Sequence, residues 1–247
     1  MDVERETLVA AESGWGDLQG RFTISGAPAP AKVEITKDEA YCGKFQLVDE
    51  SLVVSESGGL ANVVVFLSLK RGEAVPTHES YAASADETVV MDNFQCRFVP
   101  RVVLLRSTQT LAVLNSDPDD IAHNAKIDGD PPINITIAPG GKITHKFKAQ
   151  RLPATVSCSI HPWMIGRLVV KDTPYMAVTD KEGALVIKDL PAGKWQFVAW
   201  HERLGYVAKV DVGGAAQEWT RGQVDAEVKS GETTDLGEMK LDFANYP

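Results

Sequence analysis

The 247-residue chain has few cysteines, few aromatic residues, no long apolar segment and no excess of positive charge. Lysine and arginine total 25 against 34 aspartate and glutamate residues, which gives a formal net charge of −9. Because an acidic surface repels phosphate backbones, nucleic acid is not an expected partner. The longest mostly apolar stretch, around residues 61–67, is far shorter than the ~20 residues of a membrane-spanning helix, so we expect no membrane span.

The N-terminal residues 1–6 are mostly charged and lack the apolar segment of a secretory signal. Two interpretations follow: a cytoplasmic protein, or a mature exported protein whose leader has been removed. The three cysteines favour the second, because Cys42 and Cys96 remain as a candidate disulfide once Cys158 is assigned to the metal-type motif described below. Two unpaired buried thiols are the alternative. We therefore expect a periplasmic or extracellular protein.

Short apolar or alternating runs recur along the chain, separated by glycine, proline, asparagine and aspartate. They include residues 31–36, 62–67, 102–105, 111–114, 133–137, 142–147, 166–170, 185–187 and 195–199. Runs of this length at intervals of about 8–12 residues predict an all-β protein made of sandwiches or barrels. Only residues 2–13 have a pattern compatible with a short helix.

Two stretches, residues 58–66 and 177–197, carry a signature of their own. In the second, residues 179–183 and 190–193 are typical of tight turns, with aspartate, proline and glycine at the reversals. Both stretches resemble the carboxypeptidase regulatory-like, or transthyretin-like, β-sandwich. Because these stretches lie on either side of a central region, the resemblance implies one sandwich interrupted by another domain; two sandwiches in series are the alternative. The expected parts are an N-terminal extension (1–15), the two parts of a transthyretin-like sandwich (16–88 and 173–247) and a central domain (89–172).

The strongest chemical signature lies in the loop that carries Cys158, His161 and Met164. These residues occupy positions i, i+3 and i+6 between two predicted strands, so a thiolate, an imidazole and a thioether can converge on one point. Such soft ligands suit copper, and a blue-copper site needs a second histidine. His123, which follows a strand and a polar turn and precedes Asn124, is available for that position.

Residues 115–124, residues 138–144 and the Cys158 loop together resemble a cupredoxin, with a Cys-x2-His-Pro-aromatic-Met-x-Gly spacing most similar to that of amicyanin. The resemblance implies a Greek-key sandwich over the central domain and one mononuclear type 1 copper. The implied ligands are His123, Cys158, His161 and Met164. Asn124 matches the asparagine that ties the two ligand loops together and supports the thiolate.

Ile160 departs from the amicyanin-like loop, which usually has proline between the cysteine and the histidine. Unlike proline, Ile160 has a backbone N–H, which we expect to donate to the Cys158 sulfur. Such a bond stabilises the reduced state, so Ile160→Pro is predicted to lower the midpoint potential.

A copper ion held by four protein ligands has no open position for a substrate, so the resemblance implies one-electron transfer and no enzymatic activity. Pro162 and Trp163 follow His161 and are candidates for an apolar patch that contacts a redox protein; alternatively, Trp163 caps the core. Acidic residues at 117–120, 128 and 130 are candidates for steering a basic partner such as a cytochrome, or else lie in solvated loops.

Two other function classes stay open: a copper-binding or copper-delivery protein, and a structural surface module in which copper is incidental. Structural zinc is disfavoured because the chain has no Cys-x2-Cys pair. The remaining histidines, His78, His145 and His201, form no cluster in the sequence and are interpreted as surface or structural residues.

Overall fold

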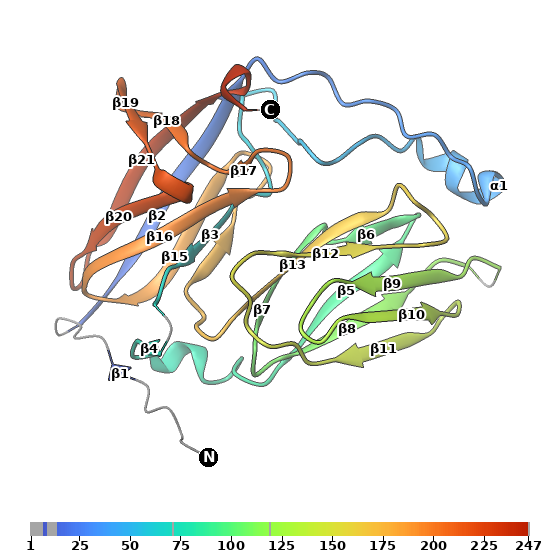
Figure 1. Cartoon of the computed structure of the whole chain (residues 1–247), viewed down its shortest axis with the longest axis horizontal. Coiled ribbons are helices and arrows are strands. Elements are labelled where there is room, and N and C mark those ends of the chain that lie inside the picture. Colours follow the sequence, from blue (N-terminus) through green and yellow to red (C-terminus); the bar gives the residue numbers. More distant parts are fainter. Residues whose placement is uncertain (1–6, 9–13, 71, 119, 247) are drawn as a thin grey trace. The chain divides into compact units, whose positions relative to one another are not determined.

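The computed structural model describes residues 7–8, 14–70, 72–118 and 120–246 (Figure 1). These residues are nearly all in strands and connecting loops, which confirms the predicted all-β class. The helix expected over residues 2–13 falls largely outside them; within that stretch, strand β1 (Thr7–Leu8) pairs in parallel with β4 (Glu73–Ala74). Over the described ranges, no helix has the length and apolar character needed to cross a bilayer.

The described chain divides into two compact units, each formed by segments that are far apart in the sequence. Unit 1 comprises the residues up to 29, residues 51–82 and those from 173 onward, and unit 2 comprises residues 30–50 and 83–172. Residues 30–50 therefore belong to unit 2, whereas the sequence analysis placed them in the first sandwich. The physical reason is that Cys42 and Leu47 are buried in the core of unit 2.

Unit 2 contains a five-stranded and a four-stranded sheet, with orders β10-β9-β12-β13-β7 and β11-β8-β5-β6. Its strands are β5 (Thr88–Phe94), β6 (Arg97–Val99), β7 (Val102–Arg106), β8 (Thr110–Asn115), β9 (His123–Ile127), β10 (Ile133–Ile137), β11 (Lys142–His145), β12 (Ala154–Ser157) and β13 (Ile165–Lys171). Alternation places apolar side chains such as Met91, Val113, Ile127 and Leu168 in one shared core. The predicted runs at 102–105, 111–114 and 166–170 fall on strands of these sheets.

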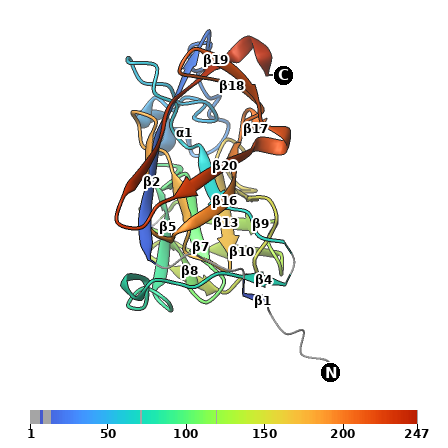
Figure 2. The ribbon, with the colours of Figure 1, turned by 90° about the vertical axis from the view of Figure 1, so that its left-hand side faces the viewer.

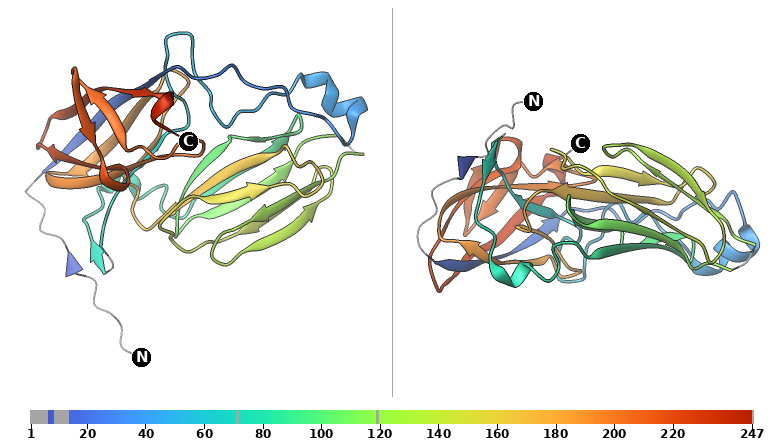
Figure 3. Two further views of the ribbon diagram at one scale, coloured as in Figure 1. Left: turned by 45° about the horizontal axis from the view of Figure 1, so that its top comes forward. Right: turned by 90° about the horizontal axis from the view of Figure 1, so that it is seen from below.

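Residues 30–50 add a short α-helix, α1 (Glu39–Cys42), and a 3-10 turn, η1 (Gly43–Phe45), at one end of the unit 2 strands (Figure 3). The two arms of this excursion are joined by backbone hydrogen bonds from Val33 N to Leu47 O (3.0 Å) and from Asp49 N to Ala31 O (2.8 Å). A disulfide between Cys42 and Cys96 fastens α1 to the turn between β5 and β6.

Unit 1 also consists of two sheets, β14-β3-β16-β17 and β15-β2-β21-β18-β19, and β20 pairs with β16 (Figure 2). Its further elements are β2 (Trp15–Ser25), β3 (Val64–Leu67), β14 (Met176–Val178), β15 (Ala184–Pro191), β16 (Gly193–His201), β17 (Gly205–Tyr206), β18 (Lys209–Val212), β19 (Ala215–Glu218), β20 (Gln223–Val228), β21 (Thr233–Asp242), η2 (Glu79–Tyr81), η3 (Thr220–Gly222) and η4 (Phe243–Asn245). Phe22, Leu60, Tyr175 and Phe197 are at most 1% exposed in its core. Residues 179–183 form the turn between β14 and β15, where Gly183 has a φ of 78° and a Cβ atom would lie 2.0 Å from the Phe22 carbonyl oxygen.

Candidate metal centre

The chain brings His123, Cys158 and His161 together in the interior of unit 2. His123 begins β9, Cys158 follows β12, and His161 lies in the loop from β12 to β13. β9 and β12 pair antiparallel, with Ser157 opposite Lys126. The start of β9 and the loop that follows β12 therefore lie at the same end of the sheet. One donor atom from each of the three residues lies within 4.8 Å of the others. All three side chains are buried, so water has little access to their donor atoms.

The surroundings of the Cys158 sulfur favour its thiolate form. The N–H groups of Asn124 and His161 donate to Sγ at 3.2 and 3.4 Å, and His161 Nδ1 lies 3.8 Å from it. Burial alone would raise the pKa of Cys158, but the neighbouring imidazoles of His123 and His161 and these two N–H groups lower it to about 6. Ile160 makes neither of the two backbone bonds, so the N–H role that the sequence analysis gave to it belongs to His161 instead.

Asn124 joins the two loops that carry the donor atoms. Its Oδ1 accepts a hydrogen bond from the Ser159 N–H (3.2 Å), and its Nδ2 donates to Asn134 Oδ1 (2.7 Å). Together with its own N–H bond to Cys158 Sγ, these contacts fix the position of the sulfur relative to β9.

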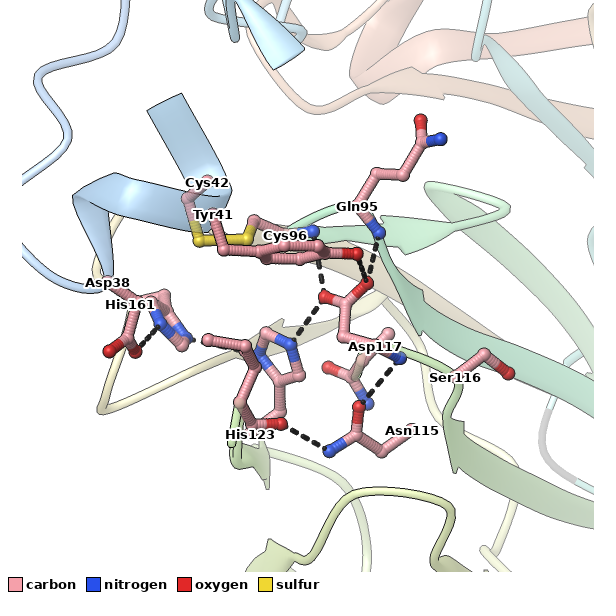
Figure 4. Close-up of polar contacts among 12 residues, drawn as sticks. Asp38, Tyr41, Cys42, Gln95, Cys96, Asn115, Ser116, Asp117, His123 and His161 are labelled. Atoms are coloured by element: carbon pink, nitrogen blue, oxygen red, sulfur yellow. Dashed lines mark hydrogen bonds and ion pairs between the residues drawn. A yellow bond between two sulfur atoms is a disulfide. The ribbon is translucent and has the colours of Figure 1, made fainter. Parts of the chain in front are cut away.

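His123 is held from behind by the buried carboxylate of Asp117. The His123 Nε2–H donates to Asp117 Oδ2 at 2.8 Å, which leaves Nδ1 to face the cluster (Figure 4). The same carboxylate accepts from the Tyr41 hydroxyl (2.9 Å) and from the N–H groups of Gln95 and Cys96. Burial would raise the pKa of Asp117, but these bonds, led by that from His123, hold it below its ordinary value.

The charge on Asp117 also acts on His123. Burial alone would lower the pKa of His123, but Asp117 and Cys158 raise it above its ordinary value. Asp117 was expected at the surface, either steering a partner or in a solvated loop, and this was wrong: the residue is 3% exposed and its oxygens accept hydrogen bonds inside the unit.

His161 is held in the same manner by Asp38, the residue before α1. His161 Nε2–H donates to Asp38 Oδ2 at 2.8 Å, and His161 Nδ1 lies 3.1 Å from His123 Nδ1 (Figure 4). The His161 side chain is 0% exposed and that of Asp38 is 24% exposed. Asp38 was not predicted from the sequence, because it lies 123 residues from His161. The one hint in the sequence was that Asp38 lies four residues before Cys42, a candidate disulfide residue.

Met164 closes the loop that carries Cys158 and His161. Its N–H donates to the His161 carbonyl oxygen (2.9 Å), and its own carbonyl oxygen accepts from the Cys158 N–H (3.2 Å). The side chain is 2% exposed and belongs to the same core as Cys158. A thioether is thus buried within the loop that supplies two of the three clustered donors.

The two residues proposed for a partner surface differ in exposure. Pro162 is exposed, whereas Trp163 is half-buried. The Trp163 indole N–H donates to the Cys96 carbonyl oxygen (3.2 Å), and its ring centroid lies 5.1 Å from that of His161. Trp163 therefore links the ligand loop to the disulfide, while Pro162 is the more exposed of the two residues.

The donor set fits a copper ion. Two imidazoles, a thiolate and a thioether form the combination found in blue-copper sites, where the thioether is a weak ligand. Both histidines have Nε2 occupied by a carboxylate, so their Nδ1 atoms are the ones left to face the sulfur. Carboxylates behind metal-bound histidines recur in metalloproteins, where they fix the tautomer and ring orientation.

No protein-family model and no curated protein matches the chain. Among solved structures, it is similar to a copper-containing nitrite reductase from Thermus scotoductus SA-01, at 23% identity and a TM-score of 0.32, over 34% of this chain and 22% of that chain. It is also similar to a Cu(I) form of an amicyanin variant, at 16% identity and a TM-score of 0.30, over 34% of this chain and 82% of that one. A second reduced amicyanin variant matches at 18% identity and a TM-score of 0.31, over 36% of this chain and 88% of the other.

Proposed function

We propose that this protein is an exported one-electron carrier with a mononuclear type 1 copper site formed by His123, Cys158, His161 and Met164. The observation that carries the proposal is the buried convergence of two imidazole Nδ1 atoms on one thiolate sulfur. Bound copper would supply a one-electron couple between Cu(I) and Cu(II).

The residues around the donors favour electron transfer without large rearrangement. The sulfur receives two backbone hydrogen bonds, and each imidazole is fixed by a carboxylate, so the donors are ordered before a metal binds. The pKa of about 6 for Cys158 means that the thiol is mostly deprotonated at neutral pH, as a ligand must be. Such preorganisation keeps the geometry similar in both oxidation states.

The same burial argues for a carrier in place of an enzyme. A substrate would need to reach the donor atoms, yet the side chains of His123 and His161 are 0% exposed and Cys158 is 2% exposed. The proposed partner is accordingly another redox protein, and a basic cytochrome suits the exposed acids Asp128 and Asp130. The Cys42–Cys96 disulfide supports an oxidising compartment, either the periplasm or the extracellular space.

The decisive experiment is a visible absorption spectrum of the purified protein after addition of Cu(II), compared with Cys158→Ser and with Zn(II) as a spectroscopically silent metal. We expect an intense sulfur-to-copper charge-transfer band that is absent from both controls and that bleaches reversibly on reduction. A folded wild-type protein that binds copper without this band would overturn the proposal. Reduction of the copper-loaded protein by a basic cytochrome at several ionic strengths then tests the partner class, because steering by exposed charges weakens as salt rises.

A further inference from the structure

We propose that Asp38 and Asp117 are positioning residues of this centre, which together fix both ligand imidazoles and lower the reduction potential of the bound ion. This inference rests on the proposed function. It starts from a symmetry in the contacts: His161 Nε2 lies 2.8 Å from one carboxylate, and His123 Nε2 lies 2.8 Å from the other. Each imidazole is thereby oriented with Nδ1 toward the thiolate.

The Asp117 arm is built for a permanent negative charge. Its two oxygens accept from four donors: His123 Nε2–H, the Tyr41 hydroxyl and the N–H groups of Gln95 and Cys96. All four groups that contact the carboxylate oxygens are therefore hydrogen-bond donors. A neutral, protonated acid would place a further hydrogen among them, so the environment selects the anion.

The Asp38 arm comes from a segment outside the ligand loops, which we call the cover segment (residues 38–45). Asp38 has a left-handed backbone, with φ 52° and ψ 39°, a conformation that aspartate adopts more readily than most residues with a side chain. The disulfide holds the cover segment at Cys42, and Tyr41 from the same segment donates to Asp117. One tethered segment therefore contributes to both arms (Figure 4).

The two carboxylates place negative charge behind the two imidazoles. A negative charge near a metal stabilises the more positive oxidation state, and a carboxylate partner raises the donor strength of an imidazole. Both effects favour Cu(II) over Cu(I). Each aspartate is therefore expected to lower the reduction potential, in addition to fixing the ring.

The orienting role is tested on metal-free protein by NMR of 15N-labelled histidine, which reports which ring nitrogen carries a hydrogen. In the wild type we expect a hydrogen on Nε2 of both His123 and His161. Asp38→Ala should expose the Nε2 hydrogen of His161 to fast exchange and leave His123 unchanged, whereas Asp38→Asn, which keeps an acceptor oxygen, should restore the slow exchange. Nε2 without a hydrogen in the wild type, or an unaltered His161 signal in Asp38→Ala, would overturn the proposal.

The charge role is tested by the midpoint potential of the copper-loaded protein. Asp38→Asn should raise the potential, and Asp86→Asn, which removes an exposed charge elsewhere in unit 2, should leave it unchanged. Tyr41→Phe should lower the potential, because the Asp117 carboxylate loses one donor and acts more strongly on His123. These opposite signs separate the proposal from general loosening of the site, which would move both variants in the same direction. Equal potentials in Asp38→Asn and wild type would refute the charge role.

The experiments distinguish failure of the proposed function from failure of the positioning proposal. If the wild type gives no charge-transfer band with copper, the proposed function fails, while the NMR result on metal-free protein still decides whether the aspartates orient the imidazoles. If the band is present but the midpoint potentials of Asp38→Asn and Tyr41→Phe equal that of the wild type, or shift in the same direction, the positioning proposal fails and the proposed function stands. Asp117→Asn is left out of this test because it threatens folding, and Tyr41→Phe probes that arm in its place.

Discussion

Asp117→Asn is expected to destabilise unit 2 of the metal-free protein strongly. In the wild type, Oδ2 accepts from His123 Nε2–H and Cys96 N–H, and Oδ1 accepts from Tyr41 and Gln95 N–H. An asparagine offers one acceptor oxygen and an NH₂ group. Whichever side receives the NH₂ group, it meets two donors, one of which is a backbone N–H that cannot change its role.

The magnitude follows from the donors left without an acceptor. A buried donor without a partner costs about 1–3 kcal/mol, so the two donors facing the NH₂ group together cost roughly 2–6 kcal/mol. Rotation of the Tyr41 hydroxyl, or a tautomer change at His123, relieves one of them. The stranded backbone N–H of Gln95 or Cys96 sets a lower limit of about 1–3 kcal/mol.

A urea titration with a probe confined to unit 2 measures this loss. Trp163 is the only tryptophan within residues 30–50 and 83–172, so fluorine-labelled tryptophan gives one resonance that reports on unit 2. The matched control is Asp38→Asn, since Asp38 accepts from one imidazole only and an amide oxygen can replace that bond. A loss below about 1 kcal/mol in Asp117→Asn, or an equal loss in the control, would refute the reasoning.

The pH dependence of the same difference has a defined sign. The pKa of Asp117 is lower in the folded state than its ordinary value of 3.8, so folding favours the ionised form. Its contribution to stability is complete above the unfolded pKa and is lost as the pH falls through the folded one. The gap between wild type and Asp117→Asn should therefore be constant near neutral pH and shrink in acid. A gap that grows in acid would show that the anion is not the stabilising form.

Three further predictions concern other residues. Burial lowers the pKa of Lys171 to about 8, so folding disfavours its charged form. The free energy of unfolding of the wild type relative to Lys171→Gln should therefore rise between about pH 8 and 10.5. Urea titrations that show no change of this difference with pH would contradict the prediction. The double variant Cys42→Ser/Cys96→Ser opens a link across 54 residues and should lose roughly 4 kcal/mol in the same assay, whereas unchanged stability would show that the cover segment does not depend on the bridge. Ile160→Pro should leave the copper charge-transfer band in place, because the N–H donors to the sulfur are those of Asn124 and His161; a large displacement of the band would restore the role first expected for Ile160.

The sequence predicts the strands and the core of the centre because both depend on local patterns. Alternating runs fix which residues face a core, and the i, i+3, i+6 spacing of Cys158, His161 and Met164 limits how far apart these side chains can lie. His123 was found through its neighbours, since it follows a strand and a polar turn and precedes Asn124. Asn124 follows directly from His123, and the structure shows it between the two loops.

The outer contacts of the site escape such reasoning because they depend on pairing across long separations. Asp38 lies 123 residues from His161, and Tyr41 lies 76 residues from Asp117. Nothing in the segment around Asp38 has a metal-type spacing. Asp117 was interpreted as a surface charge because it stands in an acidic run with proline, and only the fold shows that its side chain points inward. The excursion of residues 30–50 into unit 2 has the same origin, since one disulfide and the burial of Leu47 decide it.

The position of Asp38 also changes where an electron is expected to leave the centre. From the sequence, a redox partner was expected at Pro162 and Trp163, which follow His161. In the structure the His161 side chain, ring edge included, is 0% exposed, and the group in contact with its Nε2 is the partly exposed Asp38 carboxylate. A partner at this edge would therefore touch the cover segment first, so its charge preference should depend on Asp38 and Lys44 at that surface. If so, Lys44→Glu should alter the rate of reduction by a charged partner at low salt while leaving the potential unchanged, and the effect should fade as ionic strength rises. A rate that does not respond to Lys44→Glu at low salt would place the exit elsewhere in unit 2.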